Sequence, residues 1–389
     1  MDLKKRLGRY EQCSVAGESY QAYIPAKLPF APPLQLDEQH LNLLEETNRA
    51  LGRLDGVATL LRDVSLFLYM YIRKEAVLSS QIEGTQSSLS DLLLFEQNAV
   101  PGVPLDDVQE VSNYVAALEH GLKRLRDDDF PLSLRLIREI HEVLLAKGRG
   151  STKEPGEFRR SQNWIGGTRP GNAVFVPPPP EHLPELLGNL EKFLHDVPQK
   201  TPTLLKAAIV HVQFETIHPF LDGNGRIGRL LITIILCLEG ALKEPLLYLS
   251  LYFKTHRSEY YDLLQKVRIE GVWEAWFNFF LNGVNETAQT AVETSRRILR
   301  LFDEDRQKVQ GLGRASANAL RLLETMQKRP LASIQDMTKQ LEVTPPTARA
   351  GFAALEKLGI LTEISGKQRR RRFAYKNYID LLQEGVELI

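Results

Sequence analysis

The sequence predicts a mainly α-helical protein with more than one domain. A chain of 389 residues exceeds what one ordinary hydrophobic core supports, so two or three domains are expected. Apolar side chains recur at helical spacing along several segments. The 43% hydrophobic and 25% charged residues are typical of a water-soluble globular protein, and no apolar run approaches the length of a membrane helix.

The first elements follow a proline-rich stretch at residues 24–38, which we expect to be extended. Helical spacing predicts a helix over 37–61 and a second over 62–82, which Gly84 would cap. Residues 148–180 are rich in Gly and Pro and contain the strand-like run NAVFV, so we expect a functional loop there. Further helices are predicted at 88–97, 106–126, 133–146, 181–195, 203–216, 225–239, 256–270, 273–283 and 285–310.

The glycines of GLG at 311–313 predict a domain boundary. Three predicted helices follow it, and then a hairpin with a basic tip, GKQRRRRF at 366–373, which together make the pattern of a winged helix-turn-helix. Residues 311–389 hold 13 Lys/Arg and 8 Asp/Glu, a balance of +5, in a chain whose net charge is zero. The helices are predicted at 315–327, 333–343 and 344–360.

Two readings of this basic unit stay open. It either contacts a nucleic-acid backbone or serves protein contacts only. The predicted recognition helix carries only Arg349 and Lys357 as cations, which is a modest surface for DNA.

The cysteines and the first residues predict a cytoplasmic location. Cys13 and Cys237 cannot build a disulfide framework, and Cys237 lies in an apolar run where a buried free thiol is expected. The start MDLKKRLGRYEQ lacks the apolar stretch of a secretory signal. We therefore expect no membrane partner.

The stretch IHPFLDGNGRIGR at 217–229 concentrates groups that bind phosphates. Gly223 and Gly225 give the backbone freedom and let a ligand approach closely. The first amides of the following helix point back into this turn and form an anion site. Arg226 and Arg229 lie three residues apart on one face of that helix, so both reach toward the same anion.

A base and a metal ligand lie in the same turn. His218 is the nearby group that can take a proton near neutral pH, and Asp222 offers an oxygen to a Mg²⁺ that bridges phosphates. Each feature alone is more often a plain turn, a helix cap or a solvated face, but their joint occurrence indicates a di- or triphosphate substrate and a hydroxyl to be deprotonated. His211 could join His218 and Asp222 in a metal site, but core packing suits it better.

The stretch HPFLDGNGRIGR resembles the signature of the Fic family, HPFx[D/E]GNGRxxR, at every fixed position. The resemblance spans about residues 60–300, because GEFR at 156–159, the loop ending in NAVFVPPPP and the distal HRSEYYDLLQ are also family-like. It implies a Fic-type helical bundle with a short β-hairpin flap. The implied domains are an N-terminal helical region with an inhibitory helix at 1–105, a catalytic core at 106–310 and the winged-helix domain at 311–389.

Most Fic proteins move AMP from ATP to a Ser, Thr or Tyr hydroxyl of a target protein, and the resemblance implies this activity with ATP as substrate and Mg²⁺ as the metal. His218 would deprotonate the hydroxyl, Phe220 would pack beneath the motif, and Asp222 would hold Mg²⁺ on the α- and β-phosphates. Attack falls on the α-phosphorus and pyrophosphate leaves. The phosphates would be bound by the amides of Gly223, Asn224 and Gly225, by Arg226 at the β-phosphate and by Arg229 at the γ-phosphate.

The resemblance also implies contacts for the adenine and the target. Tyr260 and Tyr261 would lie near the adenine, although Arg268 stands where some relatives have Asn, which leaves these contacts open. The flap would pair with an extended segment of the target by strand addition, through Val174, Phe175, Val176 and Pro177.

The segment SSQIEG at 79–84 gives a second short signal. Ser79 and Glu83 lie four residues apart on one helix face, and Gly84 ends the helix. They match the family's inhibitory pattern, [S/T]xxxE[G/N], at a position before the motif, which resembles the class with an N-terminal inhibitory helix. The resemblance implies that Glu83 pairs with Arg229, so that ATP binds in a non-productive pose.

Other functions stay open at this stage. The chain could be a DNA-binding winged-helix regulator in which the catalytic unit is secondary. The same site could instead remove AMP, with Glu83 orienting a water molecule. The sequence does not identify the target protein, and self-modification and a homodimer are both compatible with it.

Overall fold

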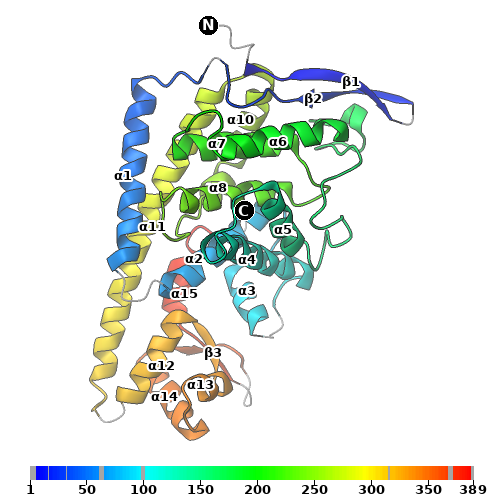
Figure 1. Cartoon of the computed structure of the whole chain (residues 1–389). Coiled ribbons are helices and arrows are strands. Elements are labelled where there is room, and N and C mark those ends of the chain that lie inside the picture. Colours follow the sequence, from blue (N-terminus) through cyan, green and yellow to red (C-terminus); the bar gives the residue numbers. More distant parts are fainter. Residues whose placement is uncertain are drawn as a thin grey trace.

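The computed structural model describes residues 6–15, 17–31, 33–60, 65–97, 101–313, 316–366 and 371–386. Within them the chain is mainly helical, as the sequence predicts, with a bundle beside a long helix pair and a smaller unit at one end (Figure 1). The long pair consists of α1 (Glu38–Leu60) and α11 (Trp273–Gln310). The bundle helices are α2 (Ser65–Ile82), α3 (Leu89–Glu96), α4 (Leu105–Arg126), α5 (Leu134–Leu144), α6 (Leu183–Leu194), α7 (Thr203–Ile217), α8 (Asn224–Leu238), α9 (Ser250–Thr255) and α10 (Arg257–Glu270).

Helices α7 and α8 form the centre of the bundle and carry the motif between them. Nearly every residue of α7 is buried, including the polar Lys206, His211, Gln213 and Glu215, so the helix is enclosed on all faces. It packs against α8, α6 and α11, while α8 also contacts α4, α2 and α5. The turn that joins α7 to α8 is therefore held by helices from both halves of the chain.

An N-terminal hairpin was not predicted. Strands β1 (Arg9–Val15) and β2 (Glu18–Ile24) pair antiparallel, with Cys13 opposite Tyr20. Apolar alternation does not predict this hairpin because β1 is largely polar. The inner face of β2 packs Tyr20 and Ala22 against Val176 of the flap.

Residues 273–310 form one helix, whereas the sequence predicts two with a break at residue 284. Gly283 lies against the ring of Tyr252, where a Cβ would come within 2.6 Å of Cδ1, so the glycine serves close packing and does not end the helix. Helix α11 runs beside α1 and reaches the C-terminal unit (Figure 1). Helix α9 was also not predicted.

The C-terminal unit has the three helices and the hairpin that the sequence predicts. Strands β4 and β5 pair antiparallel, and β3 joins the other edge of β5. Phe352 stacks on Phe373 at 4.3 Å and so attaches α14 to this sheet. The prediction of a basic tip falls on residues 367–370, which lie outside the described part. The elements are α12 (Ser316–Lys328), β3 (Leu331–Ser333), α13 (Ile334–Gln340), α14 (Pro345–Lys357), β4 (Thr362–Glu363), β5 (Arg372–Ala374) and α15 (Lys376–Gln383).

The segment after α15 packs against α2. Lys74 Nζ donates to the carbonyl oxygen of Glu384 at 2.9 Å, and Gln81 Nε2 donates to that of Val386 at 3.2 Å. Arg297 of α11 holds the Glu384 carboxylate through two hydrogen bonds of 2.7 Å. The C-terminal unit is thereby attached to the helix that precedes Glu83.

None of the helices in the described ranges combines the length and apolar character needed to cross a bilayer.

Deletion of residues 384–389 is expected to destabilise the protein. The deletion removes the carbonyl acceptors of Lys74 and Gln81 and the buried side chain of Val386, so the free energy of unfolding should fall by about 2–4 kcal/mol. The melting temperature should fall by roughly 5 °C, as measured by differential scanning calorimetry. Lys376→Ala is the control, since it breaks only an exposed ion pair with Asp380 and should leave the melting temperature nearly unchanged. An unchanged melting temperature of the deletion variant would contradict this packing.

Candidate active site

The motif turn is closed by the side chain of Asn224. Helix α7 ends at His218, whose backbone is left-handed with φ 49°, and Pro219 prevents continuation. The Phe220 amide donates to Asn224 Oδ1 at 2.9 Å, and Asn224 Nδ2 donates to the Phe220 carbonyl at 2.8 Å. This places His218 at one end of the turn and the first amides of α8 at the other.

A buried histidine supports the turn, and nothing in the sequence pattern singled it out beyond its place on a predicted helix. The Gly156 amide donates to His141 Nδ1 at 2.9 Å, so Nε2 carries the proton and donates to the Asp222 carbonyl at 3.0 Å. Burial lowers the pKa of His141 to about 4, which keeps the ring neutral at pH 7. It stacks on Phe220 at 3.6 Å, and Phe220 is fully buried beneath the motif, as expected.

The GEFR segment joins the motif to the flap loop. Arg159 Nε donates to the His218 carbonyl and the Arg159 amide donates to the Pro219 carbonyl, both at 2.9 Å. Asn163 Nδ2 donates to the Phe220 carbonyl at 3.0 Å. The sequence indicated that GEFR leads into the flap, but it did not predict that Arg159 fixes the backbone of the histidine.

A cavity of about 290 Å³ opens at this turn. Its wall includes His218, which is 19% exposed and therefore accessible from the cavity. The first amides of α8 have no carbonyl partner within the helix and point toward this end. The structure thus brings most of the predicted motif residues together with Glu83. The lining residues are Glu83, Glu110, Arg149, His218, Leu221, Asp222, Gly223, Asn224, Gly225 and Arg226.

Two residues that the sequence did not single out hold Arg226. Glu110 of α4 accepts a hydrogen bond from Arg226 Nη1 at 3.0 Å, and Arg149 Nε donates to the same carboxylate at 2.6 Å. Arg226 is nearly buried, so this pairing compensates its charge and fixes its direction.

Asp222 fits a Mg²⁺ ligand that acts together with phosphates. Its Oδ1 accepts from the Gly223 amide at 2.6 Å. Its Oδ2 faces Gly150. A Cβ on Gly150 would lie 2.6 Å from this oxygen, so the glycine leaves space around the carboxylate. No group of three or more His, Cys, Asp or Glu suited to a metal occurs in the described ranges. Mg²⁺ commonly keeps waters and takes substrate phosphates beside one or two carboxylates, which suits a single aspartate.

Arg229 and Glu83 form an ion pair in the buried wall of the site. Arg229 Nη2 donates to Glu83 Oε1 at 2.6 Å and to the Ser79 carbonyl at 2.9 Å, and its Nε donates to Ser79 Oγ at 2.9 Å. A Cβ on Gly225 would lie 2.1 Å from Glu83 Oε1, so the glycine makes room for the carboxylate. Burial raises the pKa of Glu83, but Arg229 outweighs this effect and holds that pKa below its usual value. Gly84 ends the helical segment with φ +98°.

The two tyrosines differ in their access to a ligand. Tyr260 is buried, and its hydroxyl is hydrogen-bonded to His211 Nε2 at 2.8 Å. Tyr261 is 40% exposed, so of the two it has the surface that a base could contact. His211 is fully buried among aromatic rings, which confirms its assignment to the core.

The flap is held from both sides. Ile165 and Phe175 form a short antiparallel bridge, while the Val176 carbonyl accepts from the Tyr23 amide of β2 at 2.9 Å. Val174 is 70% exposed, whereas Phe175 and Val176 are buried. An incoming strand would therefore meet a flap that already has one partner.

Arg268 connects the flap with the end of α7. Its guanidinium lies 3.9 Å from the centre of the Phe175 ring, and it donates to Thr216 Oγ1 at 3.2 Å and to the Glu215 carbonyl at 3.3 Å. These contacts give this arginine a packing role near His218.

Sequence comparison identifies two regions of the chain. Residues 41–123 match the family described as Fic/DOC family N-terminal, and residues 131–236 match the Fic/DOC family. A protein adenylyltransferase Fic of Aedes aegypti is 32% identical over 233 residues, covering 59% of this chain and 43% of that relative. The corresponding protein of Culex quinquefasciatus is 30% identical over 233 residues with the same coverage. This chain spans less than half the length of these curated relatives.

Two solved structures share the fold. A Fic family protein from Desulfovibrio desulfuricans superposes with a TM-score of 0.58 at 21% identity, covering 88% of this chain and 97% of that chain. A signalling protein with a Fic domain from Bacteroides thetaiotaomicron superposes with a TM-score of 0.51 at 21% identity, covering 64% of this chain and 95% of that chain. With the motif geometry and both domain matches, we conclude that this chain belongs to the Fic/DOC family.

Proposed function

We propose that this protein transfers AMP from ATP to a Ser, Thr or Tyr hydroxyl of a target protein. The observation that carries the proposal is the single cavity in which His218, Asp222, the α8 amides and Arg226 meet. The name of the relatives, protein adenylyltransferase Fic, supports the same reaction.

His218 is suited to accept the hydroxyl proton. Burial, with a further contribution from Arg268, lowers the pKa of His218 to about 4, so the ring is neutral at pH 7. Its Nδ1 lies 3.3 Å from the Glu215 carbonyl, and a ring that donates from Nδ1 keeps the Nε2 lone pair for the proton. The hydroxyl oxygen then bonds to the α-phosphorus, the bond from that phosphorus to the bridging oxygen breaks, and pyrophosphate leaves.

The phosphates would lie against the start of α8. The amides of Asn224 and Gly225 would donate to them, as would that of Gly223 once it leaves Asp222 Oδ1, with Arg226 at the β-phosphate and Arg229 at the γ-phosphate. Asp222 would hold Mg²⁺, which supplies positive charge to the phosphates when bound.

We further propose that Glu83 inhibits the reaction. Its carboxylate occupies Arg229 Nη2, the group that the γ-phosphate needs. The Arg229 side chain is 2% exposed whereas that of Glu83 is 36% exposed, so the arginine keeps a nearly buried charge that a phosphate anion could compensate in place of Glu83.

Glu83→Gly is expected to raise AMP transfer at least about tenfold, since removing the competing carboxylate frees the γ-phosphate site. The measurement is the labelling of proteins in a lysate with α-labelled ATP and, separately, with γ-labelled ATP. Glu83→Gln should give an intermediate rate because it keeps a hydrogen-bond acceptor without the charge. His218→Ala in the Glu83→Gly background should abolish labelling.

Three outcomes decide against parts of this proposal. Label from γ-labelled ATP alone would indicate phosphorylation instead of AMP transfer. Equal rates for Glu83→Gly and the wild type at matched ATP would contradict inhibition by Glu83. Release of AMP from a modified target by the wild type but not by Glu83→Gly would favour AMP removal.

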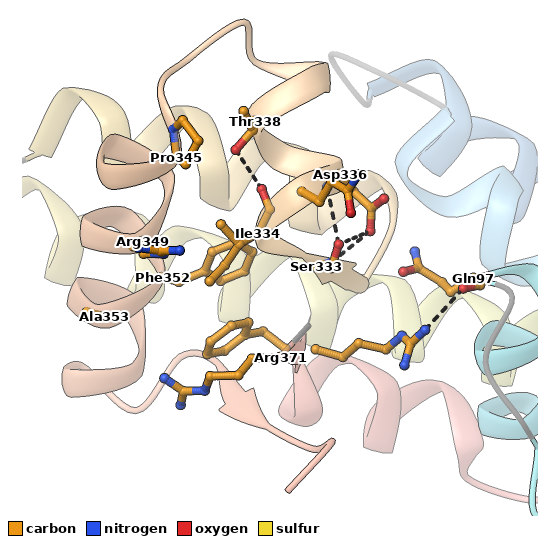
Figure 2. A pocket seen from close by; sticks show the side chains of 13 residues that line it. Gln97, Ser333, Ile334, Asp336, Thr338, Pro345, Arg349, Phe352, Ala353 and Arg371 are labelled. Carbon is orange, nitrogen blue, oxygen red and sulfur yellow. Dashed lines mark hydrogen bonds between the residues drawn. The ribbon is translucent and has the colours of Figure 1, made fainter. Parts of the chain in front are cut away.

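We also propose a second function, nucleic-acid binding by the C-terminal unit. A cleft of about 960 Å³ lies between α13, α14 and β5, with Gln97 at its edge (Figure 2). Arg349 of α14 and Arg371 beside β5 line two of its walls, and Arg372 lines the side nearest Gln97. Within the described residues this lining carries three arginines and one aspartate, which suits a phosphate backbone.

The double variant Arg349→Ala with Arg371→Ala should weaken duplex DNA binding across sequences. If each arginine contacts a phosphate, the slope of log affinity against log salt should become shallower by about 0.9 for each. Fluorescence anisotropy between 50 and 200 mM salt, with about threefold or larger weakening expected, measures both effects. The matched control replaces Arg296 and Arg300, two exposed arginines of α11. Equal affinity of the double variant and this control for DNA would contradict nucleic-acid binding and would favour a role of the unit in protein contacts.

Several features stay predictions. The domain bounds 1–105, 106–310 and 311–389 and the winged-helix assignment rest on element order. Self-modification, a homodimer and a cytoplasmic location are predictions from the sequence. Cys13 and Cys237 are both free thiols.

A further inference from the structure

A second carboxylate lies beside the catalytic histidine. Glu215 precedes His218 by three residues, and its Oε2 lies 3.9 Å from His218 Nδ1. The residue is only 6% exposed, and its Oε1 has no hydrogen-bond partner among the described residues. Buried polar atoms are nearly always paired, so this arrangement calls for an explanation.

The fold keeps space for this carboxylate. A Cβ on Gly228 of α8 would lie 2.5 Å from Glu215 Oε1 and 3.3 Å from His211 Nδ1. Any side chain at Gly228 would therefore displace Glu215 from its place beside the histidine.

The proposed reaction creates a charge that needs such a group. When His218 takes the hydroxyl proton, it becomes an imidazolium in a buried place near Arg268 and Arg159, two cations that disfavour it. Glu83 favours the imidazolium, but Glu83 must leave Arg229 when the γ-phosphate binds. Among the described residues, Glu215 is the carboxylate that has an oxygen within 4 Å of a His218 ring nitrogen.

We propose that Glu215 is a positioning residue for the base: its carbonyl oxygen holds His218 Nδ1–H at 3.3 Å, which directs Nε2 to the target hydroxyl, and its ionised carboxylate, 3.9 Å from Nδ1, stabilises the imidazolium. This inference rests on the proposed AMP transfer. No atom is exchanged with Glu215, since the proton passes from the hydroxyl to His218 Nε2 and afterwards to solvent.

The ionisation of Glu215 gives the inference a pH dependence. Burial raises the pKa of Glu215 to about 7, so the carboxylate is charged above that pH and neutral below it. Transfer should therefore increase as the pH rises through about 7. The titratable and charged groups that face Glu215 are His211 and His218 at α7, Arg229 of α8, Tyr260, Tyr261 and Arg268 of α10, and Glu83 after α2.

The kinetic test uses Glu83→Gly protein, with α-labelled ATP, between pH 5.5 and 9. Adding Glu215→Gln should lower kcat at pH 8 by about 30-fold or more and remove the rise through pH 7, with the KM for ATP changed less than about twofold. Glu215→Asp should recover part of kcat and restore the rise. Asp305→Asn is the matched control, because Asp305 is a buried carboxylate bonded to Tyr375 and remote in sequence from the motif. The Asp305→Asn protein should keep the increase in transfer rate through pH 7.

A second readout does not require transfer. With ¹⁵N-labelled histidine, the ring resonances of His218, assigned through His218→Ala, should shift as the pH passes about 7 although the ring itself stays neutral there. Glu215→Gln should abolish this step. An unchanged step or an unchanged pH profile in the Glu215→Gln protein overturns the inference. Absence of α-label with Glu83→Gly would refute the proposed function, and the resonance step would still decide the role of Glu215.

Discussion

The candidate site depends on one tight turn, the connection between α7 and α8. Two hydrogen bonds between Asn224 and the backbone of Phe220 close this turn. The closure fixes the histidine at the end of one helix and the unpaired amides at the start of the next. His141 and Arg159 hold the same backbone from below and from the flap side. The groups that would act on a phosphate are thus in place before a ligand arrives, which is what electrostatic catalysis requires.

Helix α8 achieves its close approach to two carboxylates through glycines. Gly225 makes room for Glu83, and Gly228 makes room for Glu215. Glu83 pairs with Arg229, and Glu215 lies beside His218. Of the two carboxylates, Glu83 is paired with Arg229 of a different helix, whereas Glu215 has one oxygen without a hydrogen-bond partner among the described residues.

The sequence predicted the central part of this structure because its signals are local. The helices around the motif follow apolar spacing, and the pairing of Glu83 with Arg229 was expected from a short pattern. Contacts between residues far apart in the chain could not be predicted from local patterns. Glu110 and Arg226 lie 116 positions apart, and no spacing rule connects them. Likewise, β1, β2 and β3 are short or largely polar strands, so their pairing is decided by tertiary contact more than by local preference.

The packing of α2 against residues 384–386 has a consequence for how the chain folds. Lys74 and Glu384 are 310 positions apart, and Gln81 and Val386 are 305 apart. During synthesis, α2, α7 and α8 leave the ribosome long before residue 386 does. Contacts between such distant segments form late, because the loop between their ends must close first. Helix α2 can pack against α4 and α9 early, but its surface around Lys74 and Gln81 is covered only after residues 384–386 have been made.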